Sequence, residues 1–298
     1  MATKTKPKNS GKPAKQFKYT AATADRHELY QLSVQNVEAE IDFVDATYLA
    51  LRGRHANRLR EDFAGTANSA CEWVRRRETC SAVAVDLDGP TLEWGRRHNL
   101  AALDESQQRR IELLEADVRD PGQAGQKPDI VLAMNFSYWI LTTRDSLRDY
   151  FRSVLDALPD DGVFFLDFYG GSEAMTEVQE KRKISRHLTY IWDQHRFDPI
   201  SGLMECRIHF KFPDGSQIRD AFTYNWRLWS LPEIRELLTE AGFADVGVYW
   251  EGTDPDDDEA GNGEFRPVLE GDADPAFICY LVAQKQKLGE IEPLERPE

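Results

Sequence analysis

The sequence predicts an α/β fold, built on a mostly parallel sheet with helices on both of its faces. Between residues 56 and 171, apolar segments rich in β-branched residues alternate with segments whose apolar residues recur at helical intervals. This alternation is typical of strand–helix–strand units, whose successive strands lie parallel. The chain has 298 residues, of which 41% are hydrophobic, so it can bury one large core with a smaller appended unit.

The chain begins with a basic segment that differs from the rest of the sequence. Residues 1–18 hold six lysines and no acidic residue, and we expect a disordered basic tail over residues 1–20. A tail that contacts nucleic acid, or that serves as an organellar address, is the alternative interpretation. Residues 21–55 follow with apolar side chains at helical intervals, which predicts one or two helices forming an N-terminal lid.

Five strands and three helices are expected within residues 56–171. The strands are expected at Leu59–Phe63, Ala82–Asp86, Ile111–Ala116, Ile130–Met134 and Val163–Phe168. The helices between them are expected at Ser69–Arg77, Thr91–Leu103 and Arg144–Ala157.

The pattern changes over residues 172–228, where strand-like segments are separated by short turn signals. We expect an antiparallel β insertion with strands at Leu188–Asp193, Leu203–Phe212 and Gln217–Trp226. Residues 229–288 are expected to complete the main sheet.

The completing segment begins with a helix over Leu231–Ala241, capped by Ser230 and ended by Gly242. Two strands are then expected, at Asp245–Tyr249 and Ala276–Ala283. Between these strands, residues 251–274 hold ten acidic residues and one arginine, which predicts a solvated acidic loop.

Net charge and cysteine spacing exclude some classes of function. The formal net charge of −15 argues against a nucleic-acid-binding body, because phosphate contacts need clustered Lys and Arg. No apolar run is long enough to span a membrane or to form a signal-peptide core. The four cysteines show no metal-ligand spacing, so we expect buried thiols in a reducing cytoplasm and no metal site.

Polar residues follow four successive strands of the predicted sheet. Asp62 and Gly65 follow the first strand, and Asp86 with Asp88 follows the second, roughly 20 residues after the glycine turn. Asp117 follows the third strand and Asn135 the fourth. Each residue alone is more typical of a turn or helix cap, but the series predicts a ligand site at the carboxyl edge of the sheet.

The chemistry of these residues favours a nucleoside cofactor. A carboxylate at Asp86 offers two acceptor oxygens to a ribose diol, and Asp117 can accept from an exocyclic amine, with Val118 and Leu87 as apolar faces for a base. The turn around Gly65 lacks the three glycines that a pyrophosphate needs, and Asp62 repels phosphate but suits an ammonium or sulfonium group. S-adenosylmethionine meets both conditions.

Several motifs resemble those of class I S-adenosylmethionine-dependent methyltransferases. They are EDFAGTA, VAVDLDGPTLEWGRRH, EADVRD, DIVLAMNFSYWIL and LPDDGVFFLDFYGG, so the resemblance covers roughly Leu59–Phe168. The segments RLWSLPEIRELLTEAGF and VGVYW are similar to the last helix and sixth strand of that family. The resemblance implies a Rossmann-like fold with a seven-stranded sheet and the antiparallel insertion after its fifth strand. The chain departs from the family at the glycine turn, where Ala64 and Ala67 flank a single glycine.

The resemblance also implies roles for individual residues. Asp86 would bind the ribose, Asp117 the adenine, and Asp62 with Gly65 would lie beside the methionine portion of S-adenosylmethionine. The full predicted cofactor site consists of Asp62, Gly65, Thr66, Asp86, Leu87, Asp117, Val118 and Asn135.

The acceptor of the methyl group is less well defined by the sequence. In-line methyl transfer depends mainly on alignment, and a base is needed only if the acceptor holds its proton. The candidates for a catalytic role are Tyr138, Tyr169 and His195. Other acceptor-side candidates are Ser137, Asp167 and Gly170 after strands, His27 and Tyr30 on the first helix, and the aromatic residues Tyr19, Trp139, Trp192, Trp226 and Trp229.

The acidic surface and the aromatic residues favour a small-molecule acceptor with an N or O nucleophile, such as an amine. Alternatives are a methyltransferase that acts on protein or RNA with the basic tail as docking arm, and a non-catalytic S-adenosylmethionine-binding domain. A nicotinamide-dependent oxidoreductase is disfavoured by the single glycine.

Overall fold

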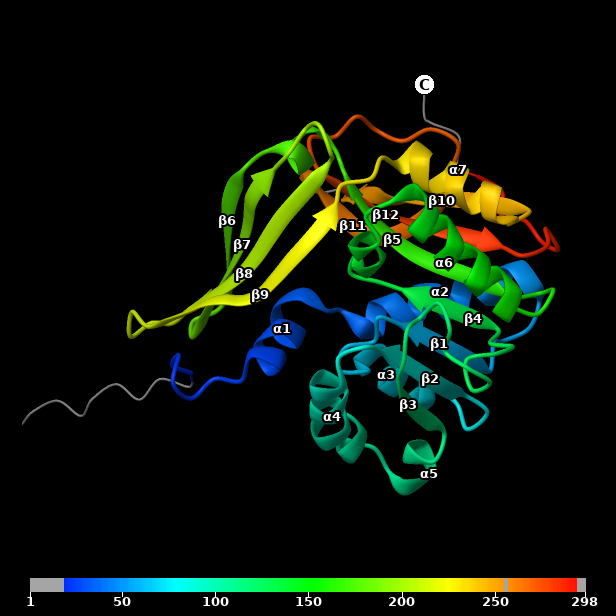
Figure 1. Cartoon of the computed structure of the whole chain (residues 1–298), viewed down its shortest axis with the longest axis horizontal. Helices are drawn as coiled ribbons and strands as arrows, with labels where there is room; N and C mark the ends of the chain where they lie inside the picture. Colours follow the sequence, from blue (N-terminus) through cyan, green and yellow to red (C-terminus); the bar gives the residue numbers. More distant parts are fainter. Residues whose placement is uncertain (1–18, 255–256, 294–298) are drawn as a thin grey trace, which may run out of the picture.

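The computed structural model describes residues 19–254 and 257–293, and its main element is an eight-stranded sheet (Figure 1). The strand order is β11-β10-β12-β5-β4-β1-β2-β3. Strands β1 to β5 pair in parallel, and the remaining three pair antiparallel with their neighbours. The parallel strands are β1 (Arg58–Asp62), β2 (Ser81–Asp86), β3 (Ile111–Glu115), β4 (Ile130–Ala133) and β5 (Val163–Gly170). The antiparallel strands are β10 (Asp245–Asp254), β11 (Asp257–Val268) and β12 (Phe277–Gln284).

The expectation of seven strands and of an acidic loop over residues 251–274 is wrong in one respect. Strand β11 adds an eighth strand at the edge of the sheet, and it lies within the predicted loop. Its pairing with β10 has register shifts, and its sequence is rich in acids and glycine, which are depleted in strands. Edge strands with charged side chains are common because the charges prevent further pairing.

The helices begin and end at ordinary capping residues. Helix α6 (Arg144–Ala157) has a capping box at Thr143, and α7 (Leu231–Ala241) has one at Ser230 and ends at left-handed Gly242. The other helices are α1 (Arg26–Val34), α2 (Val37–Arg52), α3 (Asn68–Arg76), α4 (Gly89–His98) and α5 (Glu105–Gln108), with 3-10 turns at Leu100–Ala102, Ser137–Ile140 and Ser172–Met175. Among the described residues, no helix is long and apolar enough to cross a membrane.

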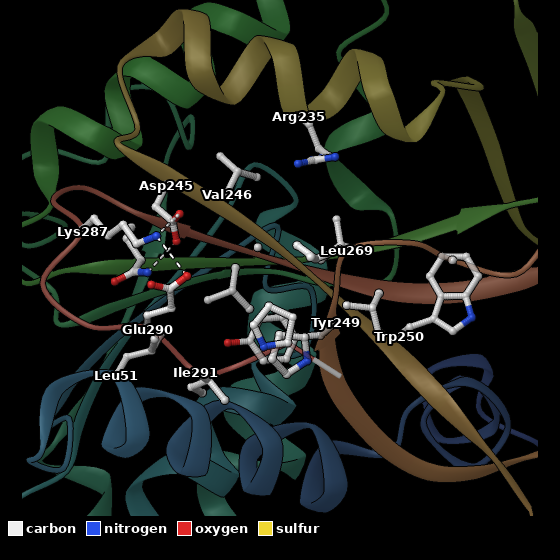
Figure 2. Close-up of a pocket in the computed structure, with 18 of the residues that line it drawn as sticks. Leu51, Arg235, Asp245, Val246, Tyr249, Trp250, Leu269, Lys287, Glu290 and Ile291 are labelled. Atoms are coloured by element: carbon white, nitrogen blue, oxygen red, sulfur yellow. Dashed lines mark hydrogen bonds and ion pairs between the residues drawn. The ribbon is translucent and has the colours of Figure 1, made fainter. Parts of the chain in front are cut away.

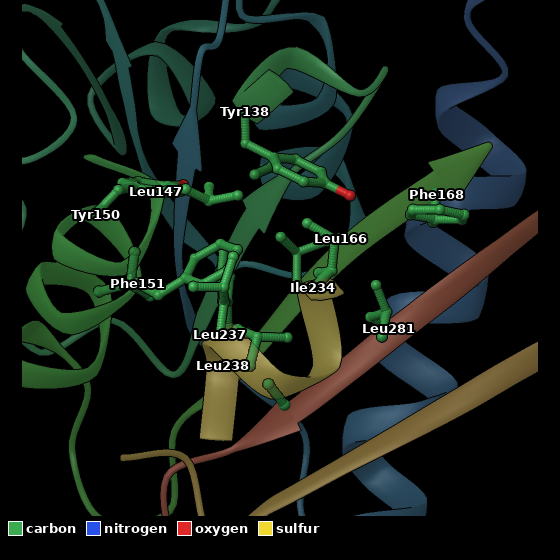
Figure 3. Packing of buried hydrophobic residues seen from close by; sticks show 14 of the residues in the cluster. Tyr138, Leu147, Tyr150, Phe151, Leu166, Phe168, Ile234, Leu237, Leu238 and Leu281 are labelled. Carbon is green, nitrogen blue, oxygen red and sulfur yellow. The ribbon is translucent and has the colours of Figure 1, made fainter. Parts of the chain in front are cut away.

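Alternate residues of the central strands enter two separate hydrophobic cores. On one face, α6 and α7 pack on the sheet, and their buried side chains meet those of β5 and β12 (Figure 3). On the other face, α2 and α3 cover the sheet, with Trp73 and Tyr48 among the buried residues. Helices therefore cover both faces, as the strand–helix alternation predicts. All four cysteines are buried free thiols.

A second, four-stranded antiparallel sheet follows β5 and extends from one end of the main sheet (Figure 1). Its strands are β6 (Val178–Ser185), β7 (Leu188–Phe197), β8 (Leu203–Lys211) and β9 (Gln217–Arg227). The predicted antiparallel insertion is therefore confirmed, but β6 is absent from the prediction because its side chains are nearly all exposed and show no apolar alternation. Helix α1 packs on this sheet through Leu29, which joins a small core with Ile208 and Phe210.

The N-terminal tail expected over residues 1–20 lies outside the described residues except for Tyr19 and Thr20. Tyr19 is buried, and its hydroxyl donates a 2.8 Å hydrogen bond to Glu28 of α1.

Candidate active site

A cavity of about 470 Å³ opens at the carboxyl ends of β1, β2 and β4, and α1 and β9 form the wall that faces these strand ends. This volume lies within the range of small-molecule sites. In open α/β sheets, ligands bind at this edge of the sheet, where the strand order reverses between β1 and β4. The cavity is lined by Arg26, His27, Tyr30, Gln35, Glu61, Asp62, Phe63, Ala64, Gly65, Thr66, Asp86, Asp88, Thr91, Met134, Asn135, Ser137, Asp220, Ala221, Phe222, Thr223 and Tyr224.

The turn after β1 has left-handed backbone at three alternate positions. Phe63, Gly65 and Ala67 have φ values of 55°, 53° and 56°. Only Gly65 adopts this conformation without steric cost, so Phe63 and Ala67 carry strain of about 1–2 kcal/mol each. Strained backbone of this kind is concentrated at functional sites. The turn therefore has left-handed backbone at three positions although only one of them is a glycine.

Asp86 is joined to this turn by a direct hydrogen bond. Its Oδ2 accepts from the backbone N–H of Gly65 at 2.7 Å, and its Oδ1 accepts from the N–H of Asp88 at 2.8 Å. Burial raises the pKa of Asp86, while these backbone hydrogen bonds oppose the increase. A carboxylate has about four lone-pair sites, so two remain for a ligand in the cavity.

Thr66 is held from two helices. Gln31 of α1 donates to its Oγ1 at 2.8 Å, and Asn99 donates to its carbonyl oxygen at 2.9 Å. Gly95 of α4 lies so close to Thr66 that an added Cβ would stand 2.7 Å from the carbonyl carbon. The position of the turn therefore depends on the packing of α4 and α1.

Glu61 and Asp62 point to opposite faces of the sheet, because successive residues of a strand alternate. Asp62 contributes to the cavity wall, but its carboxylate is buried in an ion pair with Arg60 at 2.8 Å and accepts from Tyr150 of α6 at 2.9 Å. The structure thus gives the Asp62 carboxylate partners within the protein. Both of these contacts are to Oδ2, whereas Oδ1 is buried without a hydrogen-bond partner among the described residues, so the predicted place of this carboxylate beside a cationic ligand stays a prediction.

Glu61 lies on the face that α3 covers. It accepts from the N–H of Ala70 at 2.9 Å and so caps a helix whose N-cap residue, Ala67, has no side-chain oxygen. Burial raises the pKa of Glu61 to about 8, with nearby Glu40 and Asp86 adding to the increase. Glu61 is absent from the sequence prediction. The alternation of side chains along β1 is the signal that separates it from Asp62.

The turn after β4 is fixed by the end of β5. Asn135 and Phe136 have positive φ values of 58° and 54°, and their N–H groups donate to the two carboxylate oxygens of Asp167 at 2.7 and 2.9 Å. Burial raises the pKa of Asp167 to about 7. Asn135 and Ser137 line the cavity, so Asp167 shapes its wall from behind.

Three predicted cofactor residues lie outside the cavity wall. Asp117 pairs with Arg119 at 2.6 Å, and this hydrogen bond lowers the pKa of Asp117. Leu87 is 69% exposed, and Val118 is buried in the core beside α6 and α7. Asp62, Gly65, Thr66, Asp86 and Asn135 do come together.

The three catalytic candidates also lie outside the cavity wall. Tyr138 is fully buried and donates to the carbonyl oxygen of Asp167 at 2.9 Å. Tyr169 donates to Gln194 at 3.3 Å, and His195 lies 3.7 Å from Asp193 in the second sheet. Trp139 and Trp229 are fully buried as well. The wall of the cavity that faces the strand ends is formed instead by residues of α1 and β9.

A second cavity, of about 390 Å³, lies over β10 and the C-terminal segment (Figure 2). Its polar residues pair with one another: Lys287 lies 3.2 Å from Glu290 and 3.7 Å from Asp245. It contains no residue from the carboxyl ends of β1, β2 or β4, so it is separate from the candidate site. Across the described part of the chain, no group of three or more His, Cys, Asp or Glu side chains is arranged to hold a metal ion.

Comparison with solved structures relates the chain to methyltransferases. The CcbJ methyltransferase from Streptomyces caelestis aligns with a TM-score of 0.63 and 14% identity, covering 85% of this chain and 97% of that one. CalS10, an amino pentose methyltransferase from Micromonospora echinaspora, has a TM-score of 0.61 and 16% identity over 87% and 96%. The sugar N-methyltransferase KedS8 from Streptoalloteichus sp has a TM-score of 0.59 and 15% identity over 96% and 99%.

At these identities the likeness is one of fold, and the predicted Rossmann-like class I methyltransferase fold is confirmed. No protein-family model and no curated protein sequence matches the chain.

Proposed function

We propose that this protein is an S-adenosylmethionine-dependent methyltransferase that transfers the methyl group to an N or O nucleophile of a small molecule. The observation that carries the proposal is the hydrogen bond from Gly65 to Asp86 in a covered cavity at the carboxyl edge of the sheet. A strand-end acid tied to a glycine turn is the arrangement that holds a ribose in nucleoside-binding α/β folds.

The charge of the cavity favours a cationic, phosphate-free cofactor. Among the residues that line it, Arg26 is the sole Lys or Arg, and it donates toward the carbonyl oxygen of Ala221 at 3.5 Å. Asp62, Asp86 and Asp88 lie on the strand-end side. A pyrophosphate would be repelled there, whereas the ammonium and sulfonium groups of S-adenosylmethionine would be attracted.

Within this proposal, the residues of the chain have distinct tasks. Asp86 binds the ribose hydroxyls, Gly65 and Thr66 let the backbone approach the cofactor, and Asp62, whose Oδ1 has no hydrogen-bond partner among the described residues, faces the cationic end. Bound S-adenosylmethionine supplies an electrophilic methyl group. The chain must then align the acceptor with it and exclude water, which accounts for most of the rate enhancement in such displacements.

The segments that would align the acceptor are the N-terminal helices and the β insertion. We propose residues 21–55 and 172–228 as a cover over a cofactor-binding core of residues 56–171. Tyr30 and Phe222 support this division, because their rings lie 5.0 Å apart and bring α1 against β9 at the cavity.

The solved structures support a small-molecule acceptor. CalS10 is described as an amino pentose methyltransferase and KedS8 as a sugar N-methyltransferase, while MtfA, at a TM-score of 0.53, is a glycopeptide N-methyltransferase. The likeness to these structures is one of fold, so an N or O acceptor atom for this chain is part of our proposal.

Two measurements test the proposed function. Calorimetry should detect binding of S-adenosylmethionine and S-adenosylhomocysteine, and none of NAD. Incubation with methyl-labelled S-adenosylmethionine and a cell extract should then place label in the low-molecular-mass fraction. Label in protein or RNA, lost on deletion of residues 1–18, would favour the docking-arm alternative. Binding without any labelled product would favour a non-catalytic domain, and absence of binding would overturn both.

A further inference from the structure

Helix α1 and the second sheet are packed together as one unit (Figure 1). Leu29 of α1 lies in the small core that this helix shares with β8. Before the helix, the backbone N–H of Ala21 donates to Ser216 Oγ at 3.0 Å, in the turn between β8 and β9. At its last turn, the carbonyl oxygen of Ser33 accepts from Arg182 of β6. Because these contacts hold α1 at both ends and in the middle, the helix and the second sheet should move together.

The same helix is hydrogen-bonded to the segment that follows Gly65. Gln31 Nε2 donates to Thr66 Oγ1 at 2.8 Å. Gln35, the C-cap of α1, accepts at 3.0 Å from the side chain of Asn68, the first residue of α3. These bonds join the unit of α1 and the second sheet to the proposed cofactor-binding core, directly beside the strained turn after β1.

Gln31 reaches the cavity only through Thr66. Thr66 lines the cavity, and Gln31 does not. The neighbouring residue on the helix, Tyr30, lines the wall that faces the strand ends. One short segment of α1 therefore carries both a residue of that wall and the hydrogen bond to the turn after β1.

On the basis of the proposed function, we propose that Gln31 is a positioning residue that couples the cofactor to the wall formed by α1 and β9. A cofactor bound at Gly65 and Asp86 favours the ordered turn, and so does the bond from Gln31 to Thr66. Two interactions that stabilise the same conformation strengthen each other, and this coupling is reciprocal. Cofactor binding should therefore hold α1 and the second sheet over the cavity. The acceptor should then bind to the complex with the cofactor rather than to the empty protein.

Another hydrogen bond from α1 to the core does not involve the turn. Trp94 Nε1 of α4 donates to Asp25, the N-cap of α1, at 2.9 Å. This bond holds the helix to the core in the empty protein and in the complex alike. Trp94→Phe removes the donor and keeps an aromatic ring, so it should loosen α1 while the contact between Gln31 and Thr66 stays in place.

The test is backbone hydrogen exchange in α1, measured on the full chain without ligand and saturated with S-adenosylhomocysteine. In the wild type, we expect the ligand to slow exchange in α1 by about fivefold, the value of one neutral hydrogen bond. Gln31→Ala should lose most of this response and still bind the ligand. Ala is a better helix former than Gln, so the loss cannot come from helix propensity.

Further variants separate positioning from simple stability. Thr66→Val removes the acceptor and should behave like Gln31→Ala, and the double variant should lose no more than either single variant. Thr66→Ser keeps the hydroxyl and should keep the response. Trp94→Phe should speed exchange in α1 by the same factor with and without ligand, so that the response to the ligand persists.

The proposal is overturned if the ligand binds to the wild type without slowing exchange in α1, or if Gln31→Ala keeps the full response. It is also overturned if Trp94→Phe loses the response, because any loosening of α1 would then have the same effect. Failure of the cofactor proposal gives a different result, since calorimetry would then detect no binding of S-adenosylhomocysteine to the wild type.

Discussion

The backbone N–H of Gly65 donates to Asp86 Oδ2 at 2.7 Å, and this bond fixes the turn after β1 to the end of β2. The two residues are 21 positions apart in the chain, yet they form one continuous wall of the cavity. The acid therefore has two functions in this account. It orders the strained turn in the empty protein, and it retains lone pairs for the ribose.

Gly95→Ala tests whether α4 sets the position of that turn. In an exposed helix interior, Ala is better than Gly by about 0.5–1 kcal/mol. Here the new Cβ would overlap the backbone of Thr66, so we expect the opposite sign. Urea unfolding should show lower stability, and calorimetry should show weaker binding of S-adenosylhomocysteine. Arg96→Ala, on the next position of the same helix, should affect neither, and equal behaviour of the two variants would refute the contact.

Asp62→Asn tests the buried ion pair between Asp62 and Arg60. It leaves the buried guanidinium of Arg60 without its charged partner, which costs about 3–5 kcal/mol. Urea unfolding at neutral pH should measure that loss, with the exposed Asp149→Asn on α6 as control. Unchanged stability would mean that the ion pair with Arg60 contributes nothing, and weaker binding of S-adenosylhomocysteine would support the predicted place of Asp62 in the cofactor site.

Glu61 should make the stability of the empty protein fall as pH rises. Its pKa is raised from 4.5 to about 8 in the folded state, so the folded state holds this proton more tightly than the unfolded state. The stabilisation is complete below about pH 4.5 and is lost progressively up to about pH 8. Urea midpoints at about pH 6 and pH 9 should therefore differ less in Glu61→Gln than in the wild type. Other buried acids whose pKa values are raised, Asp167 among them, contribute to the part that remains.

The matched variant Glu236→Gln, on the solvent side of α7, should keep the full dependence on pH. If Glu61→Gln also kept the full dependence of stability on pH, burial of the Glu61 carboxyl would not be the cause of that dependence.

Ala67→Gly tests the strain in the turn. Ala67 is left-handed whereas Ala64, three residues earlier, is not, and both are buried. Both substitutions remove one methyl group and add the same freedom to the unfolded chain. We therefore expect Ala67→Gly to be more stable than Ala64→Gly by about 1–2 kcal/mol in urea unfolding. Equal stabilities would mean that the left-handed conformation at Ala67 carries no cost.

The elements that the sequence predicted well are those with strong local signals. Helices α6 and α7 have the predicted bounds, because capping residues stand at their ends. Strands β6 and β11 are absent from the prediction because the sequence of each lacks an apolar alternation, and each forms by pairing with its neighbour, β7 or β10.

In the candidate site too, the residues with a strong local sequence signal were predicted better than those whose position depends on other parts of the chain. Gly65 and Asp86 stand in a local strand–turn pattern, and the structure places them together. Asp117 has an equally good position in the sequence, but Arg119 two residues away engages its carboxylate. Asp220 also lines the cavity, but it lies in a bulge of β9 that pairs with β8, and no local pattern in the sequence marks that bulge.

The central claim is tested most directly by the affinity of Asp86→Ala for S-adenosylhomocysteine, measured by calorimetry beside Asp117→Ala. Loss of the ribose hydrogen bonds should weaken binding by about one hundredfold, from roughly 1.5–3 kcal/mol for each bond to a charged group. Asp117→Ala should bind like the wild type, because its carboxylate lies outside the cavity wall and pairs with Arg119. Unchanged binding by Asp86→Ala, in a variant that unfolds cooperatively like the wild type, would contradict the account.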